Sequence, residues 1–144
     1  RLGEVSTVYG NKRHLQEDLR RSAGDTNHIE RQAVNYPVQG VCADNLKKVI
    51  TLVRESGILT RTGAVFLAPI YDECVFSCRH ENAVEMILVV HEIMTRDIPG
   101  IPVPMLATVS LGHNFGDQRE IGAFPTPELI NSTIEKVFSC QTHP

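Results

Sequence analysis

The first residues of the chain alternate between apolar and polar side chains, which is the pattern of a β-strand. The alternation runs through GEVSTVYGNKRHL, residues 3–15, and is interrupted by Gly10-Asn11. Such a dipeptide is a common turn signal between two strands. The segment therefore predicts a β-hairpin, and the polar stretch RRSAGD at residues 20–25 predicts a loop after it.

A short helix and then a break are predicted next. Asp25 or Thr26 can cap a helix that runs to Val34, with Glu30 in its first turns. A proline ring removes a backbone donor and disfavours the helical conformation of the residue before it. We therefore expect Asn35–Pro37 to interrupt this helix.

A second, longer amphipathic helix is predicted from Pro37, because proline suits the first turn of a helix. Gly57 is its predicted end, since glycine readily adopts the left-handed conformation that closes many helices. The apolar residues that fall on one stripe of this helix are Val38, Val41, Cys42, Val49, Ile50 and Val53.

Three strands and one more helix follow. We expect strands at residues 64–70 and 74–78, a helix at residues 81–94, and a third strand at residues 105–112. The helix residues expected to face the core are Ala83, Val84, Ile87, Val90 and Met94. Strands with helices between them predict an α+β fold, with an antiparallel sheet and helices packed on one face.

Two adjacent carboxylates, Asp72 and Glu73, lie at the predicted bend between two central strands. A bend can hold carboxylates at the surface while the strands beside them are buried. Aspartate is also common in ordinary polar turns, and the pair taken alone favours that plainer interpretation. A functional interpretation depends on the other motifs of the chain.

The composition is ordinary for a soluble globular domain. Of the 144 residues, 42% are hydrophobic and 22% are charged, and no apolar run approaches the length of a membrane span. The formal net charge is −3, with a mildly basic first third and an acidic remainder. This asymmetry is too weak to identify a nucleic-acid partner by itself. Without a long apolar run, no membrane partner is expected.

The four cysteines, Cys42, Cys74, Cys78 and Cys140, show no spacing typical of a disulfide framework. A reducing compartment is therefore expected, and we interpret the cysteines as small core residues. Cys74, Cys78 and His80 do not form a convincing zinc site, because strand positions four apart lie about 13 Å from each other.

The most specific motif is ERQAVNYPVQGVCAD, residues 30–44. It resembles the ER-A-N-P-QG-AAD signature of family A DNA polymerases, the bacterial DNA polymerase I type. The matching residues are Glu30, Arg31, Ala33, Asn35, Pro37, Gln39, Gly40, Ala43 and Asp44. The hairpin before it resembles the family's G-V-T-GRRR-L segment, with Asn11 and Lys12 in place of two arginines.

Two further motifs follow in the family's order. YDECVF, residues 71–76, resembles HDELVF, and SLGHNFG, residues 110–116, resembles the G-NW close of such chains. Four motifs in order across residues 3–116 make the resemblance specific. Tyr71 stands where most members have histidine, Pro69 lies in a strand that usually lacks proline, and divergence of this kind suggests a bacteriophage polymerase.

The resemblance implies a metal site at the carboxylate bend. It makes Asp72 a metal ligand and Glu73 a supporting carboxylate near the primer end. Nucleotidyl transfer by such enzymes uses two Mg²⁺ ions about 4 Å apart. Mg²⁺ prefers oxygen ligands and usually takes one or two protein carboxylates, which fits a rigid turn that presents them.

The resemblance also implies contacts with DNA. It places Arg31, Asn35 and Gln39 against the primer–template near the newest base pair, and Tyr71 near the primer sugar. Amide side chains can bind minor-groove acceptors that all base pairs share, which suits recognition without sequence preference. Helix capping or plain surface polarity remains the alternative for each of the three helix residues, and filling of the turn for Tyr71.

By the same resemblance, residues 1–120 form the C-terminal part of a palm domain with a palm-type sheet. Residues 121–144 form a C-terminal tail, with a weak helix signal from Pro127. The strand whose aspartate binds both metals is missing, and so is the fingers helix that holds the incoming nucleotide. The expected partners are therefore primer–template DNA, deoxynucleoside triphosphates, and the remaining palm and fingers regions. The expected location is the cytoplasm, that of the host if the protein is viral.

Two alternatives of other classes stay open. The chain could be a nucleic-acid-binding module without catalysis, although such a module would have no need of the Asp72-Glu73 pair. It could also be an unrelated α+β interaction domain with chance matches. On the polymerase interpretation, we expect the chain alone to be inactive, because it offers only one carboxylate turn.

Overall fold

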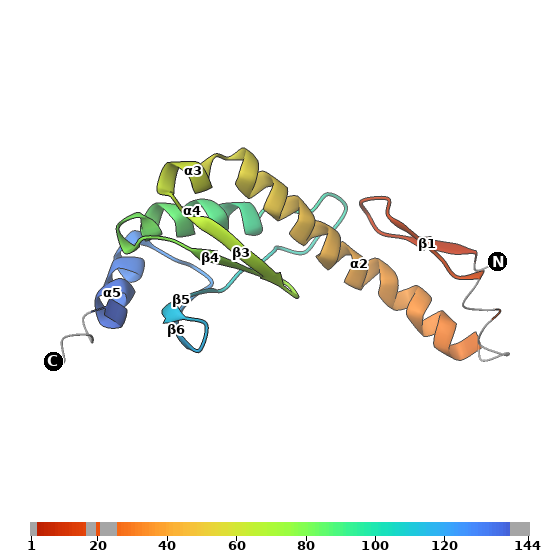
Figure 1. Cartoon of the computed structure of the whole chain (residues 1–144). Helices are drawn as coiled ribbons and strands as arrows, with labels where there is room; N and C mark the ends of the chain where they lie inside the picture. Colours follow the sequence, from red (N-terminus) through yellow and green to blue (C-terminus); the bar gives the residue numbers. More distant parts are fainter. Residues whose placement is uncertain (1–2, 17–19, 21–25, 139–144) are drawn as a thin grey trace. The chain divides into compact units, whose positions relative to one another are not determined.

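The computed structural model of the chain describes residues 3–16, 20 and 26–138 (Figure 1). Asp25, Cys140 and the predicted loop after Arg20 lie outside these residues. The described part mixes helices with short antiparallel strand pairs, which confirms the predicted α+β class. Its six strands pair as three two-stranded sheets, each a local hairpin rather than part of one continuous sheet.

The chain divides into two compact units. The first contains residues 1–48 together with Tyr71–Glu73, and the second contains residues 49–70 and 74–144. In the described part, no helix is both long enough and apolar enough to cross a membrane.

The first unit begins with the predicted hairpin. Strand β1, Glu4–Ser6, pairs with β2, Lys12–His14, in antiparallel register. The turn closes through a backbone hydrogen bond of 2.9 Å from the Thr7 N–H to the Asn11 carbonyl. Gly10 takes a φ of 86°, a left-handed conformation that glycine adopts at little cost, so the turn signal predicted the turn correctly.

Helix α2, Thr26–Glu55, follows as one continuous helix with Pro37 inside it. The predicted break at Asn35–Pro37 is therefore wrong. An interior proline costs about 3 kcal/mol, but its fixed φ is compatible with a helix. The helix is buried on both sides of the proline, at Ala33 and Val41, and this packing holds the two halves in line. The predicted end is confirmed, since Gly57 follows the last turn with a φ of 70°.

The predicted apolar stripe of this helix is correct only in part. Val41, Val49 and Val53 are buried, but Val38 is 69% exposed and Cys42 is exposed as well. Cys42 is therefore not a core residue, whereas Cys74 and Cys78 are half-buried. In the first unit the core is a small cluster of Leu15, Ile29 and Ala33, with Val5 packed against it.

The second unit holds the larger core. It contains α3 (Ile58–Thr62), β3 (Val65–Ile70), most of β4 (Glu73–Ser77), the 3₁₀ turn η1 (His80–Asn82) and α4 (Ala83–Met94). The two strands and the helix lie where the sequence predicted them. The buried residues of this core are Val49, Val53, Ile58, Ala64, Met86, Val90 and Ile93.

The predicted inward face of α4 needs a correction. Ala83 and Val90 are buried as expected, but Met86 and Ile93 are the other buried residues of this helix, and Val84 and Ile87 are only half-buried. Nine of the twelve residues of α4 are apolar, so the sequence pattern did not single out one stripe.

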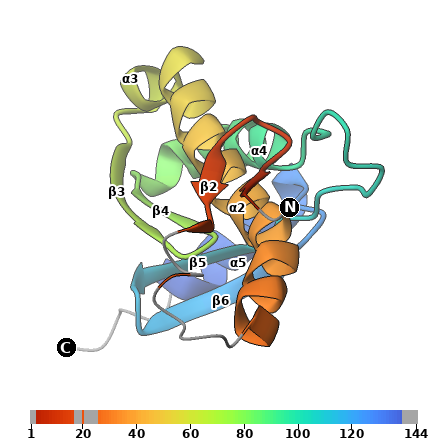
Figure 2. The same ribbon diagram turned by 90° about the vertical axis from the view of Figure 1, so that its right-hand side faces the viewer.

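The C-terminal part is a hairpin followed by a helix (Figures 1 and 2). The third predicted strand begins later than expected, as β5, Val109–Asn114, and pairs with β6, Asp117–Gly122, which the sequence analysis missed. Helix α5, Pro127–Phe138, begins at the predicted proline and packs on this hairpin. β6 runs across residue 120, and the division into palm and tail at that residue stays a prediction.

Candidate functional site

The two adjacent carboxylates lie at an exposed turn. Tyr71 and Asp72 form the turn between β3 and β4, and Glu73 is the first residue of β4; all three are exposed. Tyr71 is 96% exposed and has a φ of 55°. This left-handed conformation costs an L-residue on the order of 1–2 kcal/mol. Backbone strain of this kind clusters at active sites, ligand clamps and switch regions.

The strands that flank this turn are partly buried. On β3, residues alternate between exposed and half-buried, so Phe66, Ala68 and Ile70 point to one face. The rings of Phe66 and Phe76 pack edge to face, with centroids 5.3 Å apart, and so join the two strands. Cys74, the residue after Glu73, is already half-buried, and this burial raises the pKa of its thiol.

The carboxylate oxygens at the turn are open to a ligand. Within the part of the chain that the structure describes, neither Asp72 nor Glu73 forms a side-chain hydrogen bond or ion pair. The described residues contain no group of three or more histidine, cysteine, aspartate or glutamate side chains able to hold a metal. The turn therefore offers oxygen ligands of the kind Mg²⁺ prefers, but it completes no metal site by itself.

A row of polar side chains lies along the first half of α2. Arg31, Asn35 and Gln39 are each four residues apart and all exposed. Because α2 is continuous through Pro37, this spacing places the three side chains on one helical face. The Arg31 guanidinium donates a hydrogen bond of 3.2 Å to the Asn27 carbonyl, one turn earlier.

An open, shallow hollow of about 540 Å³ runs beside this row. It is lined by Asn27, Glu30, Arg31, Val34 and Asn35. The hollow thus brings Arg31 and Asn35 together and does not include Gln39. Asn27 was missed by the sequence analysis, although it continues the same four-residue spacing toward the N-terminus.

Exposed apolar side chains accompany the polar row on α2. Val34 is 72% exposed and Val38 is 69% exposed, one turn apart. Asn35, Gln39 and these two valines together give the helix a surface that combines amide groups with apolar contact area. Such a surface can make hydrogen bonds and apolar contacts with the same partner.

The six residues predicted to form the site belong to one of the two units. Arg31, Asn35 and Gln39 lie within residues 1–48, and Tyr71–Glu73 is grouped with them. The helical face and the carboxylate turn thus fall in the same unit, although about thirty residues separate them in sequence.

The sequence of the chain matches known proteins over most of its length. The family described as DNA polymerase family A matches residues 1–117. The chain is 29% identical over 119 residues to DNA polymerase I of Chloroflexus aurantiacus, which covers 80% of the chain. It is 31% identical over 120 residues to the thermostable DNA polymerase I of Thermus thermophilus, and 30% over 118 residues to that of Thermus filiformis, covering 83% and 82% of the chain. The matched region is only 12–14% of the length of these relatives.

Proposed function

Because the chain belongs to DNA polymerase family A, of the bacterial DNA polymerase I type, we propose that it forms the C-terminal palm segment of a DNA-directed DNA polymerase. In this role it takes part in the addition of deoxynucleotides to a primer 3′ end. The observation that carries the proposal is the exposed turn at Asp72 and Glu73, which lies within the family match.

We assign the metal-binding role to Asp72, with Glu73 as a supporting carboxylate. Both residues are exposed, both offer oxygen atoms, and half-buried strands fix the turn that carries them. These features suit Mg²⁺, of which the complete active site is proposed to hold two ions. The metal, when bound, supplies charge stabilisation at the reacting phosphate and primer oxygens.

The contribution of this chain to DNA binding is assigned to α2 and the turn. Asn35 and Gln39 donate hydrogen bonds to minor-groove acceptors near the newest base pair, and Arg31 contacts the sugar–phosphate backbone. The acceptors of the minor groove are similar in all base pairs, so these contacts hold the primer end without selecting a sequence. Tyr71, which is almost fully exposed, lies against the primer-terminal sugar.

The remaining parts of the site are assigned to other regions of the polymerase. No further cluster of metal-ligating side chains occurs among the residues that the structure describes. Nucleotidyl transfer needs a second carboxylate that bridges both ions, and a pocket for the incoming nucleotide. We therefore propose that the remaining palm and fingers regions supply both, and that deoxynucleoside triphosphates bind mainly to them.

The test of this proposal is the effect of Asp72→Ala on primer extension. The substitution is made in the polymerase that contains these residues together with the remaining palm and fingers regions. Extension is expected to be abolished while the affinity for primer–template stays largely intact, because the carboxylate acts on the reaction and not on duplex binding. Asp97→Ala is the matched control, since Asp97 is also exposed and lies in a loop outside the family motifs. Normal extension by the Asp72 variant would remove this residue from the site.

A binding module without catalysis is the second candidate function. Its support is the amide and apolar surface on α2, which would bind a duplex with or without chemistry at Asp72. The same experiment separates the two functions. If the chain were only a binding module, it would bind DNA, and substitutions at the carboxylate turn would leave primer extension unchanged.

A further inference from the structure

A buried hydrogen bond joins the β1–β2 hairpin to α2. The Thr7 hydroxyl donates to Oδ2 of Asp44 across 2.7 Å, and the two residues are only 5% and 9% exposed. Side-chain hydrogen bonds from Asn11 and Thr7 hold the pKa of the Asp44 carboxyl below its usual range. Lys47 Nζ lies 3.7 Å from the other carboxylate oxygen. A charged group this well buried and bonded fixes the turn of the hairpin on the helix.

The hairpin approaches α2 most closely at Gly40. A Cβ atom at this position would lie 2.6 Å from Cγ2 of Thr7 and 3.7 Å from the Tyr36 ring. Glycine in a helix interior costs about 1 kcal/mol relative to alanine, so α2 would be more stable by itself with a larger residue here. The glycine is explained by the contact, because only a residue without a side chain lets Thr7 reach Asp44.

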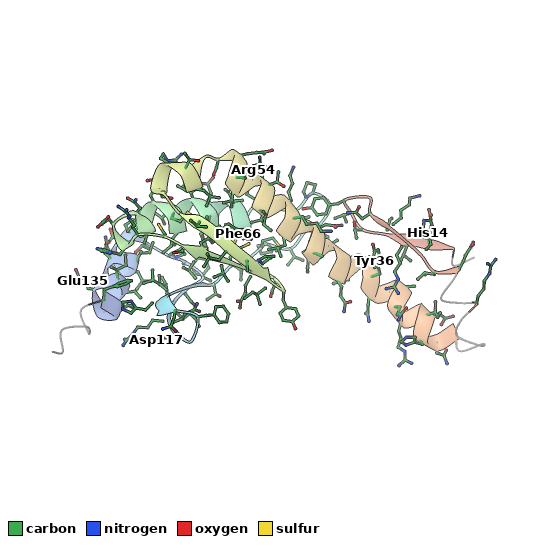
Figure 3. The ribbon with its side chains drawn as sticks, in the orientation of Figure 1. His14, Tyr36, Arg54, Phe66, Asp117 and Glu135 are labelled. Atoms are coloured by element: carbon green, nitrogen blue, oxygen red, sulfur yellow. The ribbon has the colours of Figure 1, made fainter. Side chains whose placement is uncertain are left out.

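The attached hairpin brings a basic side chain to the helix. The Arg13 guanidinium donates a hydrogen bond of 3.1 Å to Oε1 of Gln32 and lies 5.9 Å from the centroid of the Tyr36 ring. Figure 3 shows Tyr36 on α2 beside the hairpin. Gln32 and Tyr36 directly follow Arg31 and Asn35 in the sequence, so Arg13 lies on the face of the helix next to the polar row.

We propose that Thr7, Gly40 and Asp44 form a latch that positions Arg13 beside the polar row of α2, and that this latch sets the affinity of the unit for duplex DNA. The inference rests on the proposed function, since it assumes that the polar row binds primer–template. Thr7, Gly40 and Asp44 are positioning residues. Their effect passes through Arg13, whose charge then meets a backbone phosphate.

Electrostatic theory gives this proposal a measurable signature. Each phosphate contact contributes roughly 0.9 to the slope of log affinity against log salt concentration for duplex DNA. Freeing the hairpin should remove one such contact. A loss of folding stability alone would weaken binding without changing this slope, so the slope separates positioning from a merely structural role.

The experiment measures binding of the 144-residue chain to a fluorescent primer–template duplex over a range of salt concentrations. Thr7→Val removes the hydroxyl at nearly constant shape, and with it both the bond donated to Asp44 and the bond accepted from the Asn11 N–H. Binding should weaken about threefold to tenfold, the equivalent of one lost hydrogen bond to the DNA. The salt slope should fall by about one. Thr7→Ser keeps the hydroxyl and should bind like the original chain, while Gly40→Ala should resemble Thr7→Val.

A double-mutant cycle with Arg13→Ala tests the route of the effect. If the latch acts through Arg13, adding Thr7→Val to Arg13→Ala should cause no further loss of affinity. Hydrogen exchange of the Thr7 and Gly10 amides, which are bonded within the turn, reports whether each variant still forms the hairpin.

The possible outcomes separate the two proposals. Thr7→Val with unchanged affinity and salt slope overturns the latch and leaves the proposed function intact. The latch is also overturned if the losses of DNA affinity caused by Thr7→Val and Arg13→Ala add up in the double mutant. This holds even if Thr7→Val unfolds the hairpin. A chain that does not bind the duplex at all, while its hairpin amides are protected, overturns both the DNA-binding role and the inference.

Discussion

Single residues carry the proposed chemistry: two carboxylates at the β3–β4 turn and an amide side chain on α2. Asp72, Glu73 and Gln39 were predicted from short motifs, and the structure places all three in exposed positions. Their exposure and, for Tyr71, the φ of 55° were not readable, because both depend on how the turn is packed. Asn27 was missed since it lies outside the quoted motif, although its spacing from Arg31 was a usable signal.

At the residue scale, Gln39→Ala should slow extension from a correctly paired primer end. A neutral hydrogen bond contributes roughly 0.5–1.5 kcal/mol, so the expected loss is about threefold to tenfold for each bond to the minor groove. The measurement is single-nucleotide extension from matched and mismatched primer ends in the complete polymerase.

Gln118→Ala is the control for this substitution, because Gln118 is an exposed glutamine on β6 outside the family match. It should leave the extension rate unchanged. An unaltered rate and unaltered mismatch discrimination in the Gln39 variant would contradict the minor-groove role.

Among the elements, those with strong local signals were predicted well and those that depend on tertiary packing were not. Gly10-Asn11 and Gly57 marked a turn and a helix end correctly, because glycine's conformational preference acts locally. β6 was missed because its sequence, DQREIG, is mostly polar, and Ile121 is its only buried residue. The break at Pro37 was predicted from local chemistry, and packing on both sides of the proline overrides it.

The continuity of α2 predicts the effect of Pro37→Ala. Alanine restores a backbone N–H that can donate to the Ala33 carbonyl and removes the clash of the proline ring. The free energy of unfolding should rise, by at most about 3 kcal/mol. Urea unfolding followed by circular dichroism measures this change, and Pro99→Ala, in a loop, serves as the control. A lower stability would mean that packing of the proline ring outweighs the missing hydrogen bond.

The attachment of the hairpin to α2 predicts a dependence on pH. The pKa of Asp44 is lowered in the folded chain, first by side-chain hydrogen bonds from Asn11 and Thr7 and further by the charge of Lys47. Its contribution to stability is therefore complete above the ordinary aspartate pKa of about 3.9. It is lost as the pH falls through the lower pKa of the folded state.

This dependence is tested by measuring the free energy of unfolding of the chain from pH 5 downward, through the folded-state pKa of Asp44. The original chain should lose stability in this range, and Asp44→Asn should lose less, because asparagine does not titrate. Asp97→Asn, at an exposed loop position, should follow the original chain. Parallel curves for the original chain and the Asp44 variant would show that the carboxylate does not contribute in this way.

At the scale of the whole molecule, the described part leaves apolar surface open. Val65 and Leu67 on β3 are 56% and 59% exposed, and Val34 and Val38 on α2 are more exposed still. In each unit taken by itself, exposed apolar side chains of this kind can mark a contact with another chain or segment. Together with a match to only 12–14% of the length of the relatives, they support the proposal that further polymerase regions complete the site.

The last prediction follows from that proposal: residues 1–144 alone should show no nucleotidyl transfer. The reaction needs a carboxylate that bridges two metal ions, and the described residues hold no cluster beyond the Asp72-Glu73 pair that could do so. A single carboxylate turn binds Mg²⁺ weakly and cannot hold two ions in register. The test is primer extension by the purified chain, with and without the remaining palm and fingers regions added in trans. Activity of the chain alone that disappears with Asp72→Ala would exclude contamination and show that the chain contains a complete active site.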